Sequence, residues 1–118
     1  MAIVYISFFI NIVVAGFWGI VLFRNRLPKL SAVFGSDSPG IRILASLYLA
    51  IAIVSIFAIL SPVYMLSIAF VLFPLQIIYK ILSAFSVKNI RNPVVISNLG
   101  IAFLHCVSLY IIYSHTVF

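Results

Sequence analysis

The residue whose type and position best suit chemistry is His105, which lies near the middle of the apolar stretch 93–113. An ionisable side chain at the middle of a bilayer indicates function by default. Three roles are open: an axial ligand to a haem or chlorophyll-type macrocycle, a transport or catalytic group, and a neutral histidine hydrogen-bonded to Asn11, Ser55 or a partner helix. A bis-histidine haem would need another chain, because His115 is too near the end of the stretch. We favour the hydrogen-bonded role, which requires no cofactor, and keep His105 as the candidate cofactor-binding residue.

The residues that other catalytic chemistries require are missing. Asp37 is the single acidic residue and Cys106 the single cysteine, which excludes a paired-carboxylate site, an intrachain disulfide and a cysteine-based zinc site. The sequence has no glycine-rich phosphate loop and no cluster with metal-ligand spacing. The lack of a carboxylate within any apolar stretch also argues against a proton- or sodium-coupled transporter. We therefore predict no catalytic residue, no metal site and no enzymatic activity.

The apolar composition of the chain places these residues in a membrane. Of 118 residues, 66% are hydrophobic and 7% are charged, whereas soluble domains are about 45–50% apolar and about 25% charged. Uninterrupted apolar stretches cover residues 2–23, 39–60, 62–83 and 93–113. Each is long enough to cross a hydrocarbon core of about 30 Å as a helix. We predict an all-α, integral membrane four-helix bundle that forms a single domain over residues 1–118.

Three of the four predicted helices have a clear start signal. A capping side chain can accept a hydrogen bond from the free amides of the first turn, and proline at the first helical position loses nothing by lacking its own amide. Such a pair opens the second, third and fourth stretches: Ser38-Pro39, Ser61-Pro62 and Asn92-Pro93. The link between the second and third helices is so short that they should form a tight antiparallel hairpin.

All seven basic residues fall at one end of the predicted bundle, which is the positive-inside pattern. We therefore expect both termini on the extracytoplasmic side, in a prokaryotic plasma membrane or, alternatively, the inner mitochondrial membrane. Contact with lipid headgroups explains the net charge without a nucleic-acid partner. Lys80, about one turn inside its stretch, should extend its stem to the interface. The predicted headgroup residues are Arg24, Arg26, Lys29, Arg42, Lys80, Lys88 and Arg91.

Small and polar residues recur along three of the predicted helices. Helices in lipid associate through close backbone approach and polar contacts rather than through hydrophobic burial. Ser7, Asn11, Ala15 and Gly19 are four residues apart in the first stretch. Ala45, Tyr48, Ala52 and Ser55 follow a similar spacing in the second, and Asn98, Ala102 and His105 in the fourth. We predict that these stripes meet in a common interior.

Pro74 lies in the middle of the third stretch. It leaves the carbonyl of Phe70 without its helical partner and should kink the helix. Gln76 and Tyr79 could satisfy the freed groups or face a cavity. We favour packing as the role of this kink over a ligand site.

The layout of the chain resembles a known type of membrane protein. An apolar first stretch and a basic, glycine-containing loop are followed by Arg42-Ile-Leu-Ala-Ser-Leu-Tyr48 at the head of a small-residue helix, then by the short hairpin and by Asn92-Pro93. In this order of features the chain is similar to the small four-helix membrane proteins of the DoxX-like type. The resemblance implies a compact four-helix bundle, in a group that includes accessory subunits of membrane oxidoreductases. It carries over no functional residue.

We expect a non-catalytic accessory subunit of a larger membrane complex, redox or otherwise energy-transducing, whose partners are other membrane subunits and lipids. Four spans leave too few residues for a soluble catalytic domain, and the apolar faces carry no catalytic set. The alternative is a small homo-oligomeric transporter or channel. Oligomerisation would be necessary, because four helices enclose little beyond their own side chains. Its polar path would be lined by Asn11, Ser55, Gln76, Asn98 and His105.

Overall fold

The computed structural model describes residues 2–24, 34, 38–89 and 91–117, and over these the chain is helical without a strand. The first helix consists of α1 (Ala2–Ile10), a π-helical turn η1 (Asn11–Ala15) and α2 (Gly16–Arg24). It is followed by α4 (Pro39–Leu60), α5 (Pro62–Val87) and α6 (Pro93–Val117). All four helices are long and apolar enough to span a membrane. The protein is therefore an all-α integral membrane protein.

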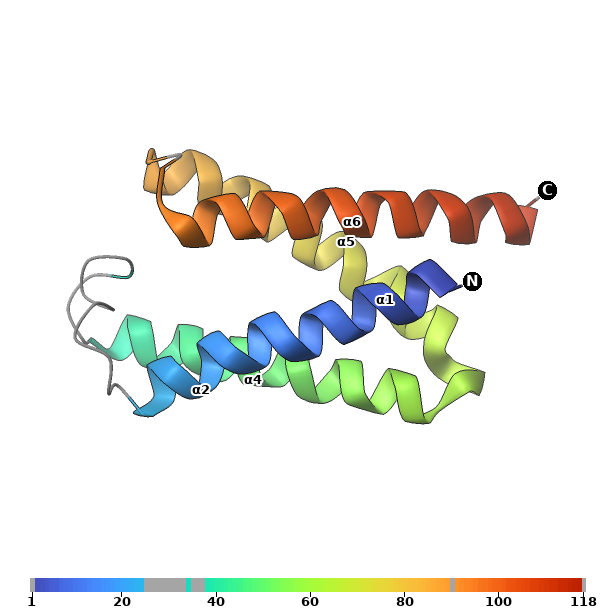
Figure 1. Ribbon diagram of the computed structural model, residues 1–118, viewed down its shortest axis with the longest axis horizontal. Coiled ribbons are helices and arrows are strands. Elements are labelled where there is room, and N and C mark those ends of the chain that lie inside the picture. Colours follow the sequence, from blue (N-terminus) through green and yellow to red (C-terminus); the bar gives the residue numbers. More distant parts are fainter. Residues whose placement is uncertain (1, 25–33, 35–37, 90, 118) are drawn as a thin grey trace.

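The four helices run antiparallel in sequence order, so that α1 begins and α6 ends at the same end of the molecule (Figure 1). We call this the terminal end. At the opposite, loop end, α2 and α5 finish and α4 and α6 begin. The first helix packs along α4, whereas α5 leaves α4 after their hairpin and crosses to pack along α6. The longest dimension of 48 Å exceeds the thickness of a hydrocarbon core.

The later helices begin at Pro39, Pro62 and Pro93, but their caps differ. Ser38 Oγ accepts from the amide of Ile41 at 3.2 Å, and Asn92 Oδ1 accepts from the amide of Val94 at 2.9 Å. The side chain of Ser61 makes no capping bond, contrary to our expectation. Ser61 ends α4 and starts α5 at once, and its backbone (φ −127°, ψ 74°) lacks the extended geometry of Ser38.

The π-turn keeps the small-residue stripe of the first helix on one face. Twelve residues of regular α-helix, from Ser7 to Gly19, would rotate the stripe by about 120°. A π-turn absorbs one extra residue, which reduces the rotation to about 20°. Ser7, Asn11, Ala15 and Gly19 are accordingly all buried. Four-residue spacing alone would have turned part of this stripe towards lipid.

Lys88 caps the C-terminal end of α5 and has a left-handed backbone with φ 58°. A side chain with a Cβ is strained in this conformation, whereas glycine adopts it freely. We expect Lys88→Gly to raise the free energy of unfolding by about 1 kcal/mol, measured by denaturant titration in detergent micelles. Lys88→Ala removes the same charge but keeps the Cβ, so it should not stabilise the protein. Equal stability of the two variants would contradict the strain.

Candidate functional site

Three buried polar side chains from three different helices form a hydrogen-bonded cluster in the middle of the bundle. Asn11 Nδ2 donates to Gln76 Oε1 at 2.7 Å, and Gln76 Nε2 donates back to Asn11 Oδ1 at 3.1 Å. Asn11 Oδ1 also accepts from His105 Nε2 at 3.0 Å. Each of the three is at most 1% exposed. We call Asn11, Gln76 and His105 the central cluster.

The central cluster lies beside the π-turn of the first helix and the proline of α5. Asn11 begins the π-turn η1, and Gln76 follows two residues after Pro74 in α5. The α5 helix continues through Pro74 from Pro62 to Val87, and the kink expected there stays a prediction. Backbone groups freed at prolines and π-turns favour nearby polar partners in a membrane. Two of the three polar side chains therefore come from segments in which backbone groups can lack a regular helical partner.

His105 is enclosed completely by the bundle, with 0% of its surface exposed. Its ring stacks on Phe73, with centroids 4.4 Å apart and planes 5° from parallel. Because Asn11 Oδ1 can only accept, Nε2 carries the hydrogen, and the buried Nδ1 has no hydrogen-bond partner. A macrocycle would find no exposed face of this side chain. The candidate cofactor role of His105 stays a prediction, and it would require the side chain to leave the central cluster.

A second polar contact joins the first and last helices towards the terminal end. The hydroxyls of Ser7 in α1 and Ser108 in α6 are hydrogen-bonded, and both side chains are fully buried. Ser55 of α4 is equally buried, but its hydroxyl has no partner. Ser7 therefore links helices, as polar side chains in membranes commonly do, whereas Ser55 does not make such a bond.

A third polar contact, towards the loop end, surrounds Lys80. Its ammonium donates to Asn98 Oδ1 at 2.9 Å and lies 5.0 Å from the centre of the Tyr79 ring. The side chain of Tyr48 lies near that of Asn98, and both face the same space. Lys80 is only 3% exposed, so it does not extend to the interface as we expected. Asn98 instead provides an acceptor for its ammonium inside the bundle. We call Tyr48, Tyr79, Lys80 and Asn98 the lysine cluster.

The other basic residues have different surroundings. Arg24, Lys88 and Arg91 are exposed at the loop end. Arg42 is also exposed, and its guanidinium donates to the carbonyl of Phe23 at 2.8 Å. The guanidinium therefore satisfies a free carbonyl at the C-terminal end of α2, and its positive charge interacts favourably with the dipole of that helix. The predicted headgroup residues Arg26 and Lys29, and the acidic Asp37, lie outside the described residues.

The lysine cluster borders a cavity of about 220 Å³ between the loop-end halves of α4, α5 and α6. Tyr48, Tyr79 and Asn98 line it, together with apolar side chains that include Leu44 and Val95. The buried hydroxyl of Tyr79 has no hydrogen-bond partner among the described residues. We call this space the loop-end cavity.

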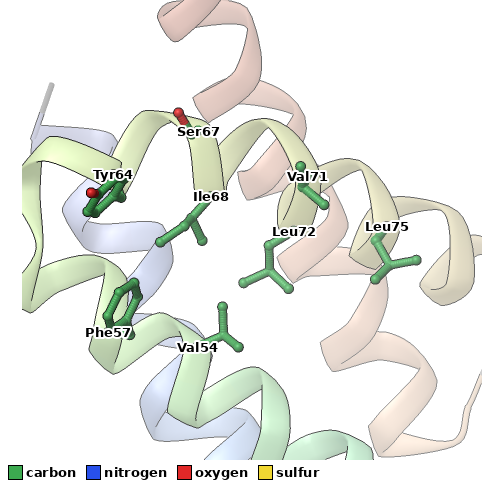
Figure 2. Close-up of a pocket in the computed structure, with 8 residues that line it drawn as sticks. All are labelled: Val54, Phe57, Tyr64, Ser67, Ile68, Val71, Leu72 and Leu75. Atoms are coloured by element: carbon green, nitrogen blue, oxygen red, sulfur yellow. The ribbon is translucent and has the colours of Figure 1, made fainter.

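A second concavity is an apolar groove of about 560 Å³ on the outside of the bundle, where α5 leaves α4. Figure 2 shows Val54 and Phe57 of α4 on one side of it, and side chains of α5 from Tyr64 to Leu75 on the other. Among its lining residues, Tyr64 and Ser67 carry hydroxyls and the others are hydrocarbon. The groove lies along spanning helices and therefore faces lipid or another membrane protein.

The small residues predicted to pack helices are also buried. Ala15 and Gly19 of the first helix, Ala52 of α4 and Ala102 of α6 are all shielded. A Cβ built on Gly19 would lie 2.9 Å from side-chain atoms of Leu49 and 3.0 Å from its backbone nitrogen. The α2 and α4 backbones therefore approach closely at this point, because glycine leaves room for them.

Two contacts went unrecognised in the sequence: the pairing of Asn11 with Gln76 and that of Lys80 with Asn98. Gln76 and Lys80 are four residues apart, a spacing that places both on one face of α5. Asn98 and His105 are seven residues apart on α6, a spacing that also places both on one face. These spacings would have indicated that Gln76 and Lys80 both point into the bundle.

The described residues contain no carboxylate side chain, since Asp37 is the one acidic residue of the chain, and no group of three metal-ligating side chains. The polar side chains of the described residues therefore pair across helices, and none of them forms a nucleophile with an adjacent base. Comparisons with protein families, with curated proteins and with solved structures find no match to this chain. The resemblance to DoxX-like proteins stays a prediction.

Proposed function

We propose that this protein is a non-catalytic accessory subunit that packs against a larger membrane complex. The observation that carries the proposal is the central cluster, in which Asn11, Gln76 and His105 bind one another in the closed interior. A transporter would need these groups to face a path, and an enzyme would need them to face a substrate. Their mutual pairing instead supports a role in holding the helices together.

The outer surface of the bundle supports the same proposal. Large apolar side chains are exposed along every helix, as expected of a protein whose neighbours are lipids and other spans. We place the contact with a partner helix in the apolar groove between α4 and α5, whose lining is almost wholly hydrocarbon. A redox or energy-transducing partner is part of this proposal and rests on the DoxX-like resemblance.

The proposal predicts that the chain, tagged at its C-terminus and extracted gently from its own membrane, migrates in an assembly that contains other subunits. Val71→Trp fills the groove and should release the chain from that assembly. Phe103→Trp is the matched control, because Phe103 is 72% exposed on α6 and Val71 is 71% exposed in the groove. Native electrophoresis with mass spectrometry of the excised band measures both results.

A particle that holds only copies of this chain would contradict the accessory role. It would favour the alternative, a homo-oligomeric transporter or channel, and would direct the work to flux assays. An absorption spectrum of the same sample tests the candidate ligand role of His105. A Soret or chlorophyll band that disappears in His105→Leu would assign the residue to a pigment.

A further inference from the structure

The lysine cluster holds a positive charge that the described part of the chain does not neutralise. Lys80 is 3% exposed, and its ammonium contacts the neutral Asn98 and the ring of Tyr79. An ammonium group has three donors, and burial strongly disfavours a cation that has no anion beside it. The described residues include no carboxylate side chain that could compensate it. A bound anion would supply the missing charge.

The loop-end cavity provides the space for such an anion. Both residues that contact the Lys80 ammonium, Asn98 and Tyr79, line this cavity. Lys80 itself does not line the cavity, but its ammonium lies 2.9 Å from Asn98 Oδ1 and 5.0 Å from the centre of the Tyr79 ring, both of which do. The Tyr79 hydroxyl is buried and finds no partner in the described part of the chain, so it retains a donor for an anionic oxygen. Charge, an unused donor and space of about 220 Å³ occur together at one place.

The position and lining of the cavity suit a phosphate group carried by a lipid. α5 continues only seven residues beyond Lys80, about 10 Å, which places the cluster near the level of the headgroups. The exposed Arg91 follows at the same end and attracts anions towards it. The remaining walls are mostly apolar: Phe34, Ile41, Leu44, Val87, Val94 and Val95. These walls can contact the glycerol and acyl carbons next to a lipid phosphate.

We propose that the loop-end cavity binds a phosphate group, with Lys80 as its charge partner and the Tyr79 hydroxyl as a donor. The apolar walls favour an anionic lipid as the source of the phosphate, and free inorganic phosphate shares the same chemistry. This site is separate from the groove and from the central cluster. It therefore does not depend on the accessory role.

The test measures the thermal unfolding temperature of delipidated protein in detergent by the fluorescence of Trp18, the one tryptophan. The additions are phosphatidylglycerol, phosphatidylcholine and inorganic phosphate. Phosphatidylglycerol should raise the unfolding temperature of the wild type, and phosphatidylcholine should not. Lys80→Met should weaken the apparent affinity for phosphatidylglycerol about tenfold or more. Lys88→Met is the matched control, since it removes an exposed lysine at the same end.

Each outcome decides the proposal. A response to phosphatidylglycerol that Lys80→Met loses and Lys88→Met keeps supports a lipid phosphate. A response to inorganic phosphate with the same dependence supports a soluble source. Equal losses in both lysine variants, or no response of the wild type to either anion, would overturn the site. If Lys80→Met does not fold, Tyr79→Phe removes only the hydroxyl, and an unchanged affinity in that variant would also overturn it.

Discussion

Replacing Asn11 by leucine is expected to lower the free energy of unfolding by about 2–4 kcal/mol. Asn11 makes three hydrogen bonds, two with Gln76 and one with His105. Leucine would leave both partners buried without them, and no water reaches side chains that are at most 1% exposed. Removing one member of a buried polar cluster costs more than removing all members together, because the others are left unsatisfied.

The difference between removing one member of the cluster and removing all three can be measured. Unfolding in mixed micelles by titration with a denaturing detergent, followed by Trp18 fluorescence, compares Asn11→Leu with the triple variant Asn11→Leu, Gln76→Leu and His105→Phe. The triple variant should be more stable than the single one. Ser46→Leu, at an exposed position of α4, should change stability little. Additive losses across the three positions would show that the side chains do not act as a cluster.

Replacing Gly19 by leucine should destabilise the bundle by about 2–4 kcal/mol. Even a methyl group at this position would lie 2.9 Å from the side chain of Leu49 and 3.0 Å from its backbone nitrogen. A side-chain atom can move away, but a backbone atom moves only with its helix. The α2 and α4 helices would therefore have to separate, and contacts along their whole interface would weaken.

Two other glycines provide matched controls for Gly19→Leu. Gly100 is exposed on α6, and a Cβ there has no neighbouring atom within 4 Å. Gly100→Leu should therefore be neutral or stabilising, because leucine favours a helix more than glycine does. Gly16→Ala would bring its Cβ to 3.8 Å from that of Ala52, an ordinary contact, and should be tolerated. Gly19→Leu with the stability of Gly100→Leu would disprove the close approach.

The number and the starts of the spanning helices could be predicted from the sequence because they depend on local properties. Apolar length decides whether a helix can cross a bilayer. The pairs Ser38-Pro39 and Asn92-Pro93 favour a helix start through the geometry of two residues alone. The side chain of Ser61 failed as a cap for a reason that is not local to its own helix, because the same residue also ends α4.

The candidate site was predictable only in part. His105 and Asn11 stand out as polar residues within apolar stretches, and hydrogen bonding between them was one of the roles considered. Gln76 was expected to satisfy backbone groups freed near Pro74 or to face a cavity, but it binds Asn11, which lies 65 residues earlier in the chain. Lys80 was expected to reach the interface, but Asn98 accepts from it inside the bundle. Which partner a polar side chain finds depends on how the helices are arranged.

By itself, the sequence determined a four-span, all-α membrane protein with its basic residues at one end, because hydropathy, proline and charge act through local physics. The tertiary structure decided which polar groups meet. The π-turn at Asn11–Ala15 keeps Ser7 and Gly19 on one face, and the crossing of α5 from α4 to α6 brings Gln76 and Lys80 to their partners. In lipid, apolar surfaces do not distinguish one helix from another, so close packing and hydrogen bonds select the arrangement. These contacts exist only once all four helices are in place.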